Sequence, residues 1–222
     1  KNLETLENTF GISLSSDNVL LNTEFKVYEN LNEEKNSDRY EFILPKFDIT
    51  KKIDNFTNLA GNFLFKSNNL IRSYETNILE KININNFIFN STPLFSKSGF
   101  ENNFEFIVKN INSDTKNSGS YKNDENFYLS GLFQYNSSFP MIKDTKDHLN
   151  ILKPKLALKI SPNYTKDISK DEGNRLDVNN IYNLDRLSSN DVLEGGASLT
   201  LGNDFSILSN ATSKELFSIK LA

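Results

Sequence analysis

The stretch "LEGGASLTLGNDFSI", Leu193 to Ile207, decides the fold, because its apolar residues recur at every second position. The apolar parity holds Leu193, Ala197, Leu199, Leu201, Phe205 and Ile207, and the other parity holds Glu194, Gly196, Ser198, Thr200, Gly202, Asp204 and Ser206. Successive side chains of a β-strand point to opposite faces. The stretch therefore predicts a strand with one apolar face and one face of small polar residues.

A second clear run is "LKPKLALKISP", which begins at Leu152. Leu152, Pro154, Leu156, Leu158 and Ile160 share one parity, and Lys153, Lys155, Ala157 and Lys159 share the other. Because proline has no N–H for a ladder hydrogen bond, Pro154 is expected near a strand start or a bulge.

Similar runs follow one another along the chain. Clear ones are "NNFEFIVKN" (102–110), "NFYLSGLFQY" (126–135) and Glu215–Leu221, and weaker ones lie near Val19–Glu29, Arg39–Ile49, Leu59–Ser67 and Tyr74–Phe89. Stretches rich in Asn, Asp, Ser and Gly separate them, as turns require. We therefore predict nine to eleven strands in an all-β, antiparallel up-and-down meander. Strands do not alternate with helices in this pattern, which argues against an α/β fold.

The composition supports a sheet with unlike faces. Only 37% of the 222 residues are hydrophobic, yet the chain has 18 Phe, 8 Tyr and 34 Asn. The net charge is −4 with the two signs mixed, so no basic stripe for nucleic acid is evident. With no Cys and a single His, His148, we expect no disulfide, no thiolate metal site and no cofactor, and most zinc, triad and His-base chemistry is excluded. The chain begins at Lys1 and ends within an alternating run, so we expect it to be a fragment.

Strand length favours a membrane barrel over a soluble sandwich. Spanning strands need about 9 to 11 residues, whereas soluble strands usually have about 5 to 6. Most of the runs reach the longer figure. A lysine facing lipid at mid-bilayer costs about 2–4 kcal/mol, so the lysine parity of 152–160 is expected to face a polar lumen.

Several stretches resemble, in order, the barrel of the LPS-assembly outer-membrane protein family LptD, also called organic solvent tolerance protein. They are "DRYEFILPKFDITKKI" (38–53), "FIVKNINSD" (106–114), "SSFPMIK" (137–143), "LKPKLALKISPN" (152–163) and "YNLDRLSSNDVLEGGASLTLG" (182–202). Each is weakly specific alone, and together they cover most of the chain.

The resemblance implies that residues 1–222 form part of an LptD-type transmembrane barrel domain. The family's periplasmic jellyroll, its remaining barrel strands and its frequent cysteines have no counterpart here. It further implies a translocon of the Gram-negative outer membrane, not an enzyme, that inserts lipopolysaccharide into the outer leaflet. The implied partners are lipopolysaccharide, an LptE-type lipoprotein plug, a periplasmic LptA-type bridge and outer-membrane lipid, with no nucleic acid.

Eight residues are candidate lumen or turn positions: Lys153, Lys155, Lys159, Asp185, Arg186, Glu194, Gly195 and Gly196. Asp185 and Arg186 suit a local ion pair or a turn that fixes strand register, or a contact with LPS phosphates or the plug. Gly195 and Gly196 suit a bulge or kink in the wall more than a ligand approach. The three lysines suit plain lumen lining, or electrostatic guidance of anionic LPS sugars.

Two other functions stay open. One is another outer-membrane barrel, such as a porin or an adhesin translocator, which an upstream jellyroll would argue against. The other is a soluble β-rich binding module, which would pack the odd parity of Leu193–Ile207 into a closed core. On the barrel hypothesis the isolated chain is a curved open sheet with two unpaired edges, and it should aggregate in plain buffer.

Overall fold

The computed structural model describes residues 4–55, 57–74, 77–162, 167–170, 176–187 and 191–222. The strands are β1 Thr5–Ser15, β2 Val19–Asn30, β3 Tyr40–Ile53, β4 Gly61–Tyr74, β5 Ile78–Ser91, β6 Leu94–Phe95, β7 Glu101–Lys116, β8 Glu125–Ser138, β9 Met141–Asp144, β10 His148–Ile160, β11 Ala197–Ser209 and β12 Glu215–Leu221. One short helix, α1, spans Asn36–Arg39. Among the described residues, no helix combines the length and the apolar character that a membrane crossing requires.

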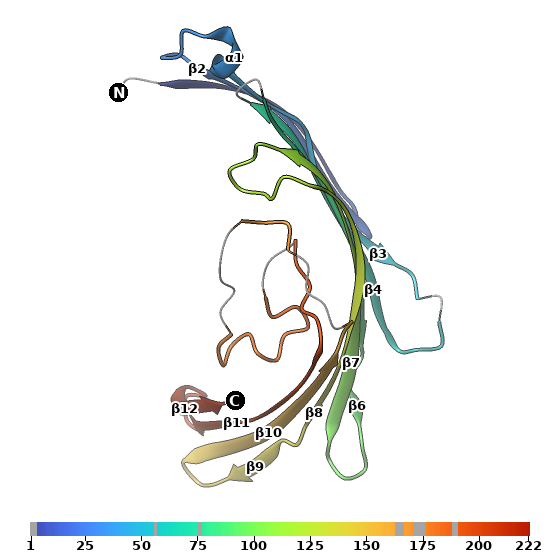
Figure 1. Ribbon diagram of the computed structural model, residues 1–222. Coiled ribbons are helices and arrows are strands. Elements are labelled where there is room, and N and C mark those ends of the chain that lie inside the picture. Colours follow the sequence, from blue (N-terminus) through green and yellow to red (C-terminus); the bar gives the residue numbers. More distant parts are fainter. Residues whose placement is uncertain (1–3, 56, 75–76, 163–166, 171–175, 188–190) are drawn as a thin grey trace.

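All strands belong to one antiparallel sheet that curves like part of a cylinder wall (Figure 1). Ten strands follow one another in the order β1-β2-β3-β4-β5-β7-β8-β10-β11-β12, while β6 pairs with β7 and β9 with β10. The predicted up-and-down meander of nine to eleven strands is therefore confirmed.

The sheet is open at both sides. Within the described residues, β1 pairs only with β2 and β12 only with β11. Every residue of these two strands is exposed. The curved open sheet with two edges is therefore as predicted.

The two faces of the sheet differ as the alternation predicted. Leu199 and Leu201 of β11 are 61% and 62% exposed on the convex face, whereas Thr200 between them is 8% exposed on the concave face. In β10, Leu158 and Ile160 are exposed on the convex face and Lys159 is buried on the other. The odd parity of β11 does not enter a closed core, which opposes the soluble-module hypothesis.

Two details of the sequence prediction need correction. Leu193 was placed with the outward residues of the strand, but β11 begins at Ala197, and Leu193 is fully buried in the connection before it. Pro154 lies in the middle of β10 rather than at its start.

The ladder is interrupted beside Pro154, which explains how a central strand accommodates it. The neighbouring edge of β10 changes there from β9 to β8, and the Phe139 N–H donates to the Pro154 carbonyl at 3.1 Å. A residue's N and C=O point to the same side of a strand, so the missing N–H faces this break.

The connection between β10 and β11 comprises residues 161–196, and its described parts, 161–162, 167–170, 176–187 and 191–196, lie over the concave face (Figure 1). Its Ile168 packs in a buried cluster with Ile82, Ile84, Ile111 and Tyr128 of the wall. Its Leu193 packs against Ile107 and Leu132. The core of the molecule thus lies between the connection and strands β5, β7 and β8.

Candidate functional site

The candidate site is the polar zone where the connection 161–196 meets the concave wall. The connection is joined first to the loop between β7 and β8. The Lys122 N–H donates to the Ile168 carbonyl at 2.9 Å, and the Lys170 N–H donates to the Ser120 carbonyl at 2.8 Å. An isolated bridge also pairs Tyr121 with Ser169. Backbone pairing between two loops therefore fixes the start of the connection.

Lys109 of β7 is the most deeply buried cation of the zone. It is 1% exposed, although its parity would give it a position in the lumen. Its Nζ donates to Asp185 Oδ2 at 3.1 Å and to the Val192 carbonyl at 2.9 Å. A buried ammonium requires such partners, because its desolvation is costly. Lys109 thus ties two points of the connection to the wall.

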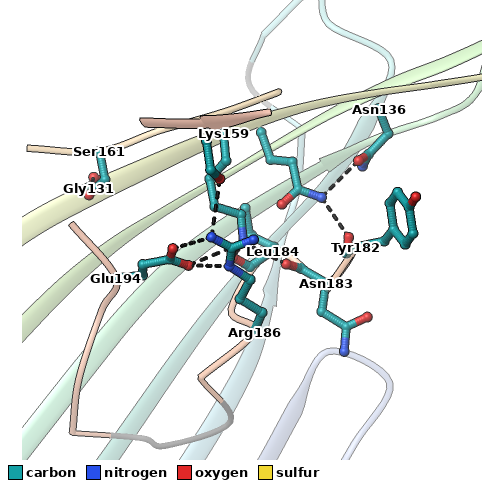
Figure 2. A network of polar contacts seen from close by, with 11 residues as sticks. Gly131, Asn136, Lys159, Ser161, Tyr182, Asn183, Leu184, Arg186 and Glu194 are labelled. Atoms are coloured by element: carbon teal, nitrogen blue, oxygen red, sulfur yellow. Dashed lines mark hydrogen bonds and ion pairs between the residues drawn. The ribbon is translucent and has the colours of Figure 1, made fainter. Parts of the chain in front are cut away.

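Lys159 of β10 lies beside the arginine of the connection (Figure 2). Its Nζ donates to the carbonyls of Asn183 and Leu184 at 2.8 and 3.0 Å and lies 3.8 Å from Glu194 Oε2. These contacts explain the burial of Lys159 in the parity that was predicted to face inward.

Arg186 forms a two-pronged pair with Glu194. Its Nε donates to Glu194 Oε2 at 2.5 Å, its Nη2 pairs with Glu194 Oε1, and Nη2 also donates to Ser198 Oγ at 3.2 Å. The planar guanidinium suits this bidentate geometry. The pair joins Arg186 to Glu194, and the bond to Ser198 fastens Arg186 to the start of β11.

Tyr182 is a further anchor. The Gln134 side-chain amide donates to the Tyr182 carbonyl at 2.7 Å and to Asn136 Oδ1 at 2.8 Å (Figure 2). The Lys155 ammonium lies 4.7 Å from the centroid of the Tyr182 ring. Burial, followed by the nearby Asp204 carboxylate, raises the pKa of Tyr182. The ring covers Gly202 of β11, where a Cβ would overlap the Tyr182 hydroxyl.

The structure separates Asp185 and Arg186, which the sequence suggested as a local pair. Asp185 binds Lys109, and Arg186 binds Glu194. The local-pair hypothesis is therefore wrong for these two residues. The two consecutive side chains have different partners. Asp185 binds the connection to the wall through Lys109, whereas Arg186 binds Glu194 within the connection.

The two glycines precede β11 and lie outside any bulge of that strand. Gly196 has φ +93°, its N–H donates to the Pro162 carbonyl at 3.0 Å, and its carbonyl accepts from the Ser161 N–H at 2.9 Å. Glycine reaches this left-handed region without steric cost. Gly196 therefore closes the base of the connection, and Gly195 precedes it in the same irregular segment.

Lys153 and Lys155 lie on the concave wall outside the buried zone. Lys153 Nζ donates to Glu101 Oε2 at 2.8 Å, and Lys155 pairs with Asp204. Both line a cavity of about 180 Å³ together with Asn136, Ser138 and Tyr182. Each lysine faces a carboxylate, so the lysine face is less positive than the sequence alone indicates.

A larger polar cleft, of about 570 Å³, lies between strands β3 to β5 and the loops that cover them. Its lining includes Lys46, Asp48, Asn68, Ser120 and Asp191, together with Ile82 and Ile84 at its base. Neutral and oppositely charged side chains are mixed here, so the cleft suits polar, hydroxyl-bearing ligands.

The arrangement favours structural fastening over catalysis. The three buried cations bind two carboxylates and several backbone carbonyls, and no acid-base pair stands beside a nucleophile in these contacts. In the part of the chain that the structure describes, no cluster of His, Cys, Asp or Glu could hold a metal ion. The sequence prediction missed Lys109, Gln134 and Tyr182. Their only signal was a polar residue on the inward parity of a strand, or an aromatic residue in a polar turn.

A family model described as LPS transport system D (LptD) matches residues 1–222. No curated protein matches the chain.

Proposed function

The chain belongs to the LptD family, and from this membership we propose that it forms part of an outer-membrane barrel wall through which lipopolysaccharide reaches the outer leaflet. The family acts in LPS transport and outer-membrane assembly. Family membership sets the process, and the shape of the sheet suggests how this chain contributes to it.

The observation that carries the proposal is the unlike character of the two faces of one curved sheet. The convex face exposes large apolar residues, including Phe10, Leu129, Leu158 and Leu199. The concave face carries lysines, acids and amides. A barrel strand in an outer membrane has this arrangement, apolar toward lipid and polar toward the lumen.

The same division suits an amphipathic cargo. Sugar hydroxyls find hydrogen-bond partners along the polar concave face, including the cleft lined by Asn68 and Ser120. Acyl chains are compatible only with the apolar side of the wall. We therefore infer that the saccharide part passes through the lumen while the acyl chains enter the bilayer sideways.

The partners follow from the same proposal. Further strands of the barrel would pair with the open edges of β1 and β12, which removes both edges. A lipoprotein plug of the LptE type would occupy lumen that the connection 161–196 leaves open. A periplasmic bridge of the LptA type would deliver lipopolysaccharide from the other side of the membrane.

Depletion of the protein in its native Gram-negative cell tests the proposal. Newly made lipopolysaccharide should fail to reach an impermeant surface label, while porins already in the membrane stay in place. A porin would instead alter solute uptake, and an adhesin translocator would alter display of a passenger. Normal arrival of labelled lipopolysaccharide after complete depletion would refute the proposal.

A further inference from the structure

Six polar side chains form a patch on the convex face, which is mainly apolar. We call it the outer amide patch: Ser67, Asn69, Asn83, Asn85, Asn110 and Asn112. These residues alternate with Ile82, Ile84 and Ile111, which face the connection on the concave side. Because neighbours in a strand point to opposite faces, the patch faces away from the lumen.

The patch is continuous across three neighbouring strands. Ser67 of β4 pairs with Asn85 of β5, which pairs with Asn110 of β7. The adjacent row pairs Asn69 with Asn83 and Asn83 with Asn112. The two rows are therefore adjacent lines of polar side chains across the outer wall.

Apolar residues flank both rows on both sides. On β3, Ile49 lies opposite Ser67 and Phe47 opposite Asn69. On β8, Leu129 lies opposite Asn110 and Phe127 opposite Asn112, and both are largely exposed. Barrel strands are tilted, so each row slopes through the bilayer. The flanking residues on β3 and β8 are apolar, so both ends of each row lie in the apolar zone of the barrel's outer surface. The patch residues between them lie at intermediate depths and therefore within the same zone.

On the same convex face, the next row on the side away from the connection 161–196 is apolar as well. Phe65 pairs with Phe87, and Phe87 pairs with Val108. On the opposite side, Lys81 pairs with Asp114 through an ion pair of 3.2 Å, and Glu125 follows in the same row. The patch is thus a polar area of the outer wall, with apolar residues on three sides and a charged rim on the fourth.

Hydrogen bonds inside the patch use only part of its capacity. Ser67 donates to Asn85 at 2.7 Å, Asn85 donates to Asn83 and Asn110 at 2.6 and 3.1 Å, and Asn112 donates to Asn110 and Asn83 at 2.7 and 3.4 Å. Each Asn amide offers two donors and two acceptor sites. Hydrocarbon cannot bind the amide donors and acceptors that remain. Hydroxyl groups can, because each one both donates and accepts a hydrogen bond.

The position along the strands indicates which part of a lipid is nearby. The connection 161–196, the longest in the chain, emerges at the same strand ends as Tyr74 of β4, Ile78 of β5 and Lys116 of β7. The patch lies near mid-strand in β4 and β5 and is nearer to this end in β7. Outer-membrane barrels carry their longer loops on the outside. An open groove of about 740 Å³ lies over this end, lined by Asn69, Asn83, Asn112, Lys81, Asp114 and Phe127 among others. The patch therefore lies in the half of the wall that faces the outer leaflet, and its charged rim of Lys81, Asp114 and Glu125 points toward the headgroups.

We propose that the outer amide patch is a binding site on the lipid-facing wall for the sugar headgroup of a glycolipid in the outer leaflet. The amides match sugar hydroxyls, and Phe127 offers an aromatic side for the sugar ring. The rim has one lysine and two carboxylates, which favours the neutral sugar part over a phosphate. The identity of the glycolipid as lipopolysaccharide rests on the proposed function.

Site-specific photocrosslinking in cells tests this site in the whole protein. A photoreactive residue at position 129 borders the patch, and one at position 201 lies on the same exposed face away from it. The patch variant is Asn83→Leu/Asn85→Leu/Asn110→Leu. It should reduce lipopolysaccharide capture at position 129 about tenfold and leave capture at position 201 unchanged.

Asn203→Leu is the matched control, because Asn203 is an outward-parity asparagine of β11 outside the patch. It should leave capture at both positions unchanged. Unaltered heat resistance of the folded barrel in electrophoresis shows that each variant folds, and leucine suits a lipid-facing position. Equal capture at position 129 with and without the patch overturns the inference, as does capture of a protein or of phospholipid alone.

Surface arrival of lipopolysaccharide in the same cells separates this inference from the proposed function. Normal arrival after depletion of the protein refutes the function, while glycolipid capture at position 129 still reports on the patch. Blocked arrival after depletion, together with unchanged capture in the patch variant, supports the function and refutes the patch.

Discussion

Gly202 shows how a single missing side chain positions the connection. A Cβ at this position would overlap both the Tyr182 hydroxyl and the Leu221 carbonyl. We expect Gly202→Ala to push the Tyr182 ring off the wall and loosen the β11–β12 ladder. Overpacking of this kind costs about 1–3 kcal/mol. Thermal unfolding of the whole protein in detergent measures the loss.

Gly131→Ala is the control for this substitution, because the added Cβ would meet only the Ile107 carbonyl at an ordinary 3.5 Å. It should leave the unfolding temperature nearly unchanged. Equal unfolding temperatures for Gly202→Ala and the unaltered protein would show that the close approach of Tyr182 has no energetic weight.

Lys109 provides a second residue-scale prediction. Lys109→Met keeps much of the volume but leaves Asp185 and the Val192 carbonyl without their donor. An unsatisfied buried polar group costs about 1–3 kcal/mol. The double variant Lys109→Met/Asp185→Asn should recover part of this loss, because it removes the uncompensated carboxylate.

The exposed pair of Lys81 and Asp114 is the comparison for Lys109. Lys81→Met should change the free energy of unfolding by about 0–1 kcal/mol, as for other surface ion pairs. Chemical denaturation of the unaltered protein, Lys109→Met, Asp185→Asn and Lys109→Met/Asp185→Asn gives the coupling between Lys109 and Asp185. A coupling between Lys109 and Asp185 of only about 0–1 kcal/mol, as for a surface ion pair, would contradict the inference that Lys109 ties the connection to the wall.

At the scale of an element, the connection 161–196 depends on Arg186. Arg186→Gln removes the two-pronged pair with Glu194 and the bond to Ser198. Hydrogen bonds of charged groups contribute about 1.5–3 kcal/mol each, so local opening should become at least tenfold more frequent. Limited proteolysis within residues 161–196, followed by mass spectrometry of the fragments, measures this opening.

Arg39→Gln is the matched control, since Arg39 also pairs with a glutamate, Glu29, but on the β2–β3 side of the molecule. It should leave cleavage within 161–196 at its original rate. The exchanged variant Arg186→Glu/Glu194→Arg should restore part of the protection. Equal cleavage rates in Arg186→Gln and the unaltered protein would mean that other contacts hold the connection.

Elements were predictable from the sequence where one face is continuously apolar. Residues 152–160 alternate throughout and residues 197–207 alternate except at Asn203, and both are strands. Leu158, Ile160, Leu199 and Leu201 are exposed on the predicted face. The run at Leu59–Ser67 stops where the outer face becomes polar, yet β4 continues to Tyr74. The run at 102–110 stops for the same reason before the end of β7 at Lys116. Alternation disappears there because both faces are polar.

The candidate site was less predictable. Parity indicated that Lys159 faces inward, but its partners are backbone carbonyls of Asn183 and Leu184, which no side-chain pattern reveals. The connection resembles a solvated loop in sequence because Asn and Asp dominate it. Burial of Ile168 and Leu193 depends on wall residues far earlier in the chain, such as Ile82 for Ile168 and Ile107 for Leu193, and no local pattern specifies these contacts.

The whole molecule is defined by which face of the sheet meets lipid. The chain has no Trp, so a single introduced Trp reports its own surroundings where the rest of the protein is also free of Trp. Leu199→Trp lies on the convex face and Lys153→Trp on the concave face of neighbouring strands. In bilayers of lipids with brominated acyl chains, we expect strong fluorescence quenching at position 199 and little at position 153, because only the convex face contacts acyl chains. A water-soluble quencher should give the opposite order. Equal quenching of both positions by the brominated lipids would contradict a wall with lipid on one side and a polar lumen on the other.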